Sequence, residues 1–142
     1  MSEEEQEQPI NLVLFSGTDD RLQAAAVLTA GAAALGKPVH IFLQYWALDA
    51  FRADRINNQL PLAPEAGPAG QEAVDRMRAA GQQSWSETMR VAKEIGEVDI
   101  QACSLSMDVL GISSDELDPL VDGVQGVAAF YVNAGSGQVV FI

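Results

Sequence analysis

The chain contains four short runs of mostly apolar residues, separated by longer segments of mixed character. These runs cover residues 10–15, 38–44, 98–102 and 138–142. Each run is shorter than a typical helix, and continuous apolar character over so few residues is typical of a buried strand. The pattern therefore predicts four strands, with the last one at or near an edge of the sheet.

Two of the intervening segments have the character of long helices. Residues 21–35 are rich in alanine, follow Thr18 as a possible cap with two aspartates in the first turn, and stop at Gly36. Residues 84–95 carry apolar side chains on one side and charged side chains largely on the other, which indicates an amphipathic helix. An intervening helix of this length makes a right-handed crossover between parallel strands the expected connection.

Shorter helices are expected in three further places. Residues 47–52 follow the second strand, and residues 103–110 follow the third. Residues 125–134 fit a helix or a strand by pattern, and we favour a helix because the glycines at 135 and 137 indicate a turn before the last strand.

Strands that alternate with helices indicate the α/β class, here a three-layer sandwich around a mostly parallel sheet of four or five strands. At 142 residues, the chain is expected to form one domain over residues 9–142. Residues 1–8 hold four glutamates and are expected to be a disordered acidic tail. Residues 53–82, which prolines and glycines interrupt, form a variable excursion with a surface helix over residues 69–80.

The formal net charge is −12. Nucleic acids and anionic membranes are therefore poor partners, because binding to them depends on clustered Lys and Arg. The polar N-terminal residues do not resemble a signal peptide or a membrane span, and a single cysteine cannot form an internal disulfide. A reducing, cytoplasmic compartment is the expected location.

The carboxyl ends of the first three predicted strands are where a ligand would bind in an open parallel sheet. Three pairs of residues follow these strands, namely Ser16 and Gly17, Tyr45 and Trp46, and Cys103 and Ser104. Cys103 lies where the third strand gives way to a helix, and a helix start stabilises a thiolate. Hydroxyl groups of Ser104 and Ser106 would add hydrogen bonds, whereas Asp108 opposes the charge. We therefore expect an accessible sulfur at this helix start.

Each of these residues also has an ordinary structural interpretation. Cys103 is as readily a small buried apolar residue as a functional thiol. Tyr45 and Trp46 could cover the sheet edge or a subunit interface. Ser16 is first of all a residue of the kind that caps helices, and His40, in the middle of the second strand, has the character of a core histidine.

Several other chemistries lack the residues that they need. One histidine and one cysteine do not make a zinc site of the usual spacing, although a carboxylate-rich metal site stays open. We expect no metal and no cofactor. The glycine-rich motifs that bind dinucleotides and nucleotide phosphates are absent, as is the G-x-S-x-G nucleophile motif. A cysteine phosphatase needs an arginine six residues after its nucleophile, and that residue is Val109.

Residues 101–112 read Q-A-C-S-L-S-M-D-V-L-G-I and resemble the A-C-S-x-S-M-D-x-x-G pattern of the DsrE/DsrF/DsrH-like family, in the DsrE-like subgroup often labelled peroxiredoxin-like. Residues 42–48 are similar to the aromatic segment of this subgroup, and residues 123–130 to its Gly-Val-Ala stretch. The peroxiredoxin label itself does not fit, because residues 95–102 lack the proline and the threonine of the P-x-x-x-T-x-x-C arrangement.

The resemblance implies the same α/β fold and a sulfur-relay protein. Cys103 would carry sulfane sulfur, as a persulfide or a thiosulfonate, and pass it to an acceptor thiol. Ser16, Gly17, Tyr45, Trp46, Ser104 and Ser106 would form the substrate-binding surroundings. The expected partners are sulfur donor and acceptor proteins or small sulfur compounds, and further copies of this chain in a homo-oligomer.

Whether the chain is an enzyme, a sulfurtransferase, or only a carrier stays open at this point. One alternative is a non-catalytic oligomeric scaffold or partner-binding subunit of a sulfur-relay complex, with a poorly reactive Cys103. Another is a thiol redox sensor, in which peroxide converts Cys103 to a sulfenic acid.

Overall fold

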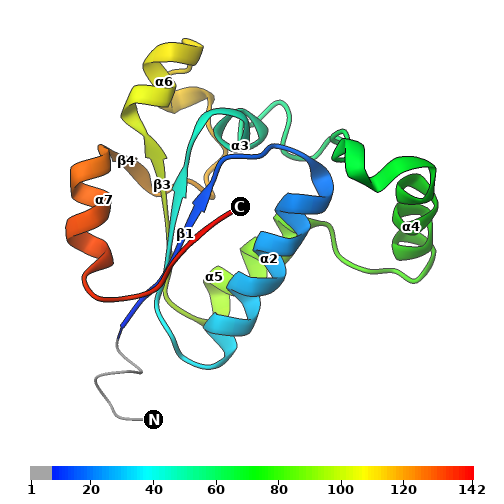
Figure 1. Ribbon diagram of the computed structural model, residues 1–142, viewed down its shortest axis with the longest axis horizontal. Helices are drawn as coiled ribbons and strands as arrows, with labels where there is room; N and C mark the ends of the chain where they lie inside the picture. The colour runs from blue at the N-terminus through cyan, green and yellow to red at the C-terminus, as the bar shows by residue number, and fades with distance from the viewer. Residues whose placement is uncertain (1–7) are drawn as a thin grey trace.

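The computed structural model describes residues 8–142, which form a five-stranded, wholly parallel sheet with helices on both faces (Figure 1). The strand order is β4-β3-β2-β1-β5. The strands are β1 Ile10–Leu14, β2 Val39–Leu43, β3 Val98–Cys103, β4 Gly123–Gln125 and β5 Val139–Phe141. The predicted fold class is therefore confirmed, including the parallel direction of the strands.

The helices cover the two faces of the sheet unequally. Helices α2 (Asp19–Ala34) and α5 (Trp85–Ile95) pack side by side on one face, and α7 (Val127–Ala134) covers the other (Figure 1). The shorter helices are α3 Tyr45–Ala50, α4 Gly67–Ala79 and α6 Ser104–Leu110, together with the 3-10 turns η1 Pro64–Ala66 and η2 Ser114–Glu116. None of the helices in residues 8–142 is both long and apolar enough to cross a membrane.

Successive side chains of each strand point to opposite faces of the sheet, so the core has a large part on one face and a small part on the other. On the α2 and α5 face, Leu12, Ile41 and Ile100 are fully or almost fully buried and belong to the main cluster. On the α7 face, the buried cluster within residues 8–142 contains only Val13, Phe42, Cys103 and Phe130. Since buried apolar area is the main stabilising term, the α7 face contributes much less to stability than the α2 and α5 face.

Most predicted element boundaries are correct within a few residues. Ser84, expected as the first residue of the second long helix, instead caps α5, because its Oγ accepts a hydrogen bond from the Glu87 N–H at 3.3 Å. Thr18 precedes α2 but makes no capping bond, and its hydroxyl instead lies 3.2 Å from the Ser16 Oγ. Residues 127–134 are helical, as favoured above.

Three expectations need correction or lie beyond the described residues. The short strand β4 was not predicted, because only Val124 of its three residues is apolar. Helix α3 begins at Tyr45 rather than at residue 47, so both aromatic residues lie within it. Residues 1–7 of the predicted acidic tail, which covers residues 1–8, lie outside the described residues, while Gln8 is described and accepts a hydrogen bond from Ser136.

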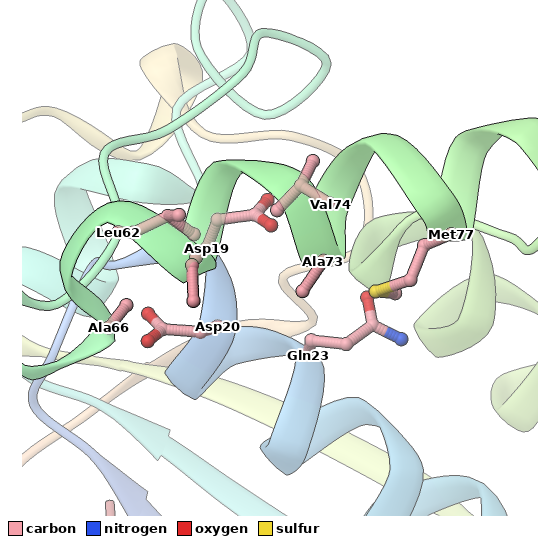
Figure 2. A pocket seen from close by; sticks show the side chains of 10 residues that line it. Asp19, Asp20, Gln23, Leu62, Ala66, Ala73, Val74 and Met77 are labelled. Carbon is pink, nitrogen blue, oxygen red and sulfur yellow. The ribbon is translucent and has the colours of Figure 1, made fainter.

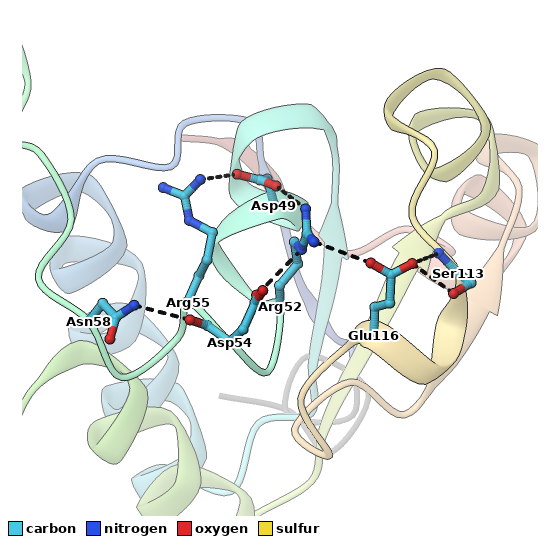
Figure 3. A network of polar contacts seen from close by, with 7 residues as sticks. All are labelled: Asp49, Arg52, Asp54, Arg55, Asn58, Ser113 and Glu116. Carbon is cyan, nitrogen blue, oxygen red and sulfur yellow. Dashed lines mark hydrogen bonds and ion pairs between the residues drawn. The ribbon is translucent and has the colours of Figure 1, made fainter.

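A network of ion pairs joins α3 to the turn that follows α6 (Figure 3). Arg52 contacts Asp49 at 3.4 Å and Glu116 at 3.2 Å, and Arg55 contacts Asp49 at 2.7 Å. Glu116 also accepts hydrogen bonds from the Ser113 N–H and hydroxyl. The segments that follow β2 and β3 are thereby held together at the carboxyl end of the sheet.

Candidate functional site

The register of the strands places the three predicted site segments at one edge of the sheet. Leu14 pairs with Leu43, and Leu43 pairs with Ala102, so β1, β2 and β3 end at the same level. Neighbouring strands lie about 4.8 Å apart, so Cys103 lies next to the end of β2 but roughly 10 Å from the end of β1. The residues after β2 are therefore nearer neighbours of Cys103 than Ser16 and Gly17.

The loops after β1 and β2 are in direct contact. The Ala47 N–H donates to the Phe15 carbonyl at 3.0 Å, and a Cβ placed on Gly17 would lie only 2.4 Å from the Trp46 carbonyl oxygen. Glycine is thus required at position 17 for this close approach. Tyr45 has a φ angle of 41°, which lies in the left-handed region that a bulky residue rarely adopts. This loop pair is a tightly constrained part of the edge.

Four aromatic rings gather at this end of the sheet. Phe15 lies 5.6 Å from Tyr45 and 5.8 Å from Phe141 between ring centroids, and Tyr45 lies 6.3 Å from Trp46. The Trp46 side chain is exposed and Phe141 is 66% exposed. The sequence predicted Tyr45 and Trp46 but missed Phe141, whose only signal is its position in the apolar terminal strand.

Ser16 has a structural role in the turn from β1 to α2. Its hydroxyl accepts hydrogen bonds from the Thr18 N–H at 3.4 Å and from Arg21 at 3.5 Å. The residue is 8% exposed. These contacts occupy the Ser16 hydroxyl, and nothing in the described residues directs it toward Cys103.

Cys103 is the last residue of β3 and immediately precedes α6, as its position in the sequence indicates. The expectation of an accessible sulfur is wrong, however, because Cys103 is only 5% exposed. The alternation of β3 points its side chain to the α7 face, where it clusters with Val13, Phe42 and Phe130. Any reaction at this sulfur therefore requires these neighbours to move.

The two serines of α6 occupy different environments. Ser104 is exposed, and its Oγ would lie 3.9 Å from a Cβ placed on Gly126, so α6 and α7 begin side by side. Ser106 is fully buried, and its Oγ has no hydrogen-bond partner within residues 8–142. Across the same residues, neither hydroxyl makes a hydrogen bond to the Cys103 sulfur.

His40 lies on the α7 face of β2, two residues before Phe42, and is half-buried. Its Nδ1 is buried without a hydrogen-bond partner among the described residues, and its register neighbour on β3 is Asp99. The interpretation of His40 as a satisfied core histidine is therefore not confirmed, because the residue is only half-buried and its Nδ1 lacks a partner among the described residues, although it lies away from the carboxyl edge beyond Leu43.

This arrangement defines a parallel α/β protein with one cysteine at the strand-to-helix junction of an inner strand. The sequence model of the DsrE/DsrF/DrsH-like family matches residues 6–76 and 59–142, which together span most of the chain. The chain therefore belongs to the DsrE/DsrF/DrsH-like family.

Two individual proteins show how far this likeness extends. The uncharacterized protein YrkE of Bacillus subtilis (strain 168) is 28% identical over 156 residues, which cover 95% of this chain and 96% of YrkE. The structure of a protein of unknown function, MTH1491 from Methanobacterium thermoautotrophicum, covers 96% of this chain and 100% of its own at a TM-score of 0.60. At 13% identity, this second likeness concerns the fold alone.

Proposed function

We propose that this protein is an intracellular sulfur carrier, in which Cys103 holds sulfane sulfur and transfers it to an acceptor thiol. The observation that carries the proposal is the position of Cys103, the one cysteine of the chain, at the junction of β3 and α6 in a member of this family. A parallel α/β sheet presents its ligands at this edge, and unpaired N–H groups at a helix start favour an anionic sulfur.

Sulfur loading from thiosulfate is a displacement at sulfur. The Cys103 thiolate attacks the outer, sulfane sulfur, a new S–S bond forms, and the S–S bond of thiosulfate breaks, with sulfite leaving with the electron pair. An acceptor thiolate then attacks the outer sulfur of the Cys103 persulfide. The new persulfide forms on the acceptor, and Cys103 leaves as the thiolate, so no external oxidant or reductant is needed.

Burial of Cys103 sets a condition on this reaction. The Phe130 ring stacks on Phe42 within the cluster that encloses the sulfur, and α7 carries Phe130. Displacement of α7, or of this ring alone, opens the sulfur to a second molecule. The small core on this face makes such a displacement less costly than opening the α2 and α5 face.

The direct test is intact mass spectrometry after incubation with thiosulfate or with a small persulfide. The wild type is expected to gain the mass of one sulfur atom, to lose it when a thiol acceptor is added, and Cys103→Ser is expected to gain nothing. An unchanged wild-type mass, or an equal gain in Cys103→Ser, would refute the proposal.

The homo-oligomer and the docking of donor or acceptor proteins belong to the same proposal. The outer side of α7 and the neighbouring strand β5 carry exposed apolar side chains, namely Val127, Tyr131, Val132, Val139 and Phe141. Exposed apolar side chains of this kind are characteristic of protein contacts where they form a patch. We place the subunit contact on this surface, beside the helix that covers Cys103.

One observation favours a second candidate function, a non-catalytic subunit of a sulfur-relay complex. Cys103 is 5% exposed, which is what a structural cysteine would show. The rate of Cys103 alkylation in the native protein separates the two candidates. A carrier is alkylated at a measurable rate that rises when α7 is destabilised, whereas a scaffold subunit is alkylated only after unfolding.

A further inference from the structure

A groove of about 430 Å³ lies between the start of α2 and the arm formed by η1 and α4, away from Cys103 (Figure 2). One wall is apolar and is formed by Leu62, Ala66, Ala73, Val74 and Met77. None of the residues of α4 is buried, so this apolar side of the helix is left without a covering element. A surface helix normally buries its apolar side against the rest of the protein, whereas the apolar side of α4 faces the open groove.

The opposite wall carries two carboxylates from the first turn of α2, Asp19 and Asp20 (Figure 2). Asp20 accepts a hydrogen bond from the Ala63 N–H at 3.0 Å. Within the described residues, the Asp19 carboxylate makes no hydrogen bond and no ion pair. Partial burial raises the pKa of the Asp19 carboxyl, and the Arg78 guanidinium offsets this only in part, from beyond ion-pair distance. Asp19 is thus a partly desolvated anion that lacks a close cation.

We propose that this groove binds a small organic cation with an apolar body, whose ammonium group pairs with Asp19 and Asp20 while its hydrocarbon part packs on α4. The ligand is expected to be positively charged, because the polar wall of the groove carries two carboxylates and the chain as a whole has a net charge of −12. The rest of the ligand is expected to be apolar, because the side chains of Val74 and Met77 are stabilised by contact with another apolar surface.

The size of the groove selects a small molecule over a protein segment. Cavities of roughly 300–1,000 Å³ are typical of small-ligand sites, and this groove lies near the lower end of that range. An ion pair and hydrogen bonds hold the arm to α2 at its η1 end. Arg21 contacts Glu65 at 3.1 Å, and the Asp19 N–H donates to the Pro61 carbonyl at 2.9 Å. The groove therefore exists before the ligand arrives.

The test is a titration with n-hexylammonium, followed through the backbone amide resonances of the isotope-labelled full chain. Hexanol and hexanoate, which have the same hydrocarbon body, serve as the neutral and anionic comparisons. Resonances of the α2 start and of α4 are expected to shift with hexylammonium and to shift far less with the other two. No shift in these segments, or equal binding of all three compounds, would overturn the proposal.

Two variants with the same loss of charge separate a specific pairing from general attraction to an acidic protein. Asp19→Asn is expected to weaken hexylammonium binding by about tenfold or more, which is the range for a hydrogen bond to a charged group. Asp75→Asn, on α4 but outside the groove lining, is expected to leave the affinity nearly unchanged. Equal losses in both variants would overturn the assignment to Asp19. Neither result depends on sulfur transfer, because Cys103 takes no part in this site.

Discussion

The rings of Phe42 and Phe130 stack with their centroids 5.0 Å apart and their planes inclined by 12°. Phe42 belongs to the sheet and Phe130 to α7, so this pair closes the α7 face over the neighbouring Cys103. We predict that Phe130→Ala lowers the free energy of unfolding by about 3–5 kcal/mol and increases the rate of Cys103 alkylation in the native protein. Urea unfolding and timed alkylation with mass detection measure the two effects.

Two further substitutions in α7 make this prediction specific. Phe130→Leu keeps an apolar side chain and is expected to show a smaller increase in alkylation rate with most of the stability retained. Asn133→Ala changes an exposed polar side chain of α7, which contacts Gln125 rather than Phe130, and should leave the rate unchanged. If Phe130→Ala and Phe130→Leu are both folded and alkylated no faster than the wild type, the Phe130 ring does not control access to the sulfur.

A second prediction concerns the contact between Gly17 and the Trp46 backbone. A Cβ at position 17 would lie 2.4 Å from the Trp46 carbonyl oxygen, so Gly17→Ala must displace one of the two loops. We expect a loss of about 1–3 kcal/mol in the free energy of unfolding, together with a change in Trp46 fluorescence. Gly31→Ala is the matched control, because a Cβ at this helical glycine meets nothing within 4 Å, and it should stabilise the protein by up to about 1 kcal/mol. Equal effects of the two substitutions would show that the close approach is not maintained in solution.

The strands and helices could be predicted from the sequence where the local pattern of apolar residues alone determines the secondary structure of the segment. The apolar runs of β1, β2, β3 and β5 are long enough to indicate buried strands, and the alanine-rich segment of α2 favours a helix without tertiary support. Strand β4 was missed because pairing with β3, rather than its own three residues, makes it a strand. Its hydrogen bonds come from a neighbour some 20 residues away, which a local pattern does not reveal.

The position of Cys103 at the end of β3 could be predicted, but its burial could not. The alternation of a strand fixes which face a side chain points to, and only the packing of Phe130 determines that this face is covered. The same reasoning applies to Ser16, whose hydroxyl is occupied by Thr18 and Arg21. The burial of Cys103 thus depends on packing against the distant helix α7, and the role of the Ser16 hydroxyl depends on contacts within its own turn; the strand pattern shows neither.

A third prediction follows from the ionisation of Asp20. Partial burial favours its neutral form, but hydrogen bonds from the Ala63 N–H and the Thr18 hydroxyl outweigh this, and the pKa of the carboxyl lies below its ordinary value of 3.8. A carboxyl with a lowered pKa stabilises the folded state above its unfolded-state pKa, and this contribution is lost as pH falls through the folded-state value. Asp20→Ala should therefore lower stability near neutral pH by about 1 kcal/mol, a figure that allows for solvent screening.

The pH dependence is the decisive part of this measurement. Urea unfolding at neutral pH and at successively lower pH should show the gap between wild type and Asp20→Ala closing below the ordinary value of 3.8. Asp75→Ala, which removes an exposed carboxylate from α4, should change stability by less than about 0.5 kcal/mol at neutral pH. A gap for Asp20→Ala that stays constant down to low pH would mean that the ionised carboxylate is not the stabilising species.

The fourth prediction tests the proposed subunit contact on the outer side of α7. Val132 is 79% exposed, and a glutamate there would place a charge in the middle of any apolar interface formed by α7 and β5. We expect multi-angle light scattering to find an oligomer for the wild type and a monomer, or a much weaker oligomer, for Val132→Glu. Val27→Glu is the control, because Val27 is 58% exposed on α2, on the opposite face of the sheet, and should leave the oligomer intact. A monomeric wild type, or the same oligomer in all three proteins, would remove α7 from the assembly, whereas dissociation by Val27→Glu alone would move the contact to α2.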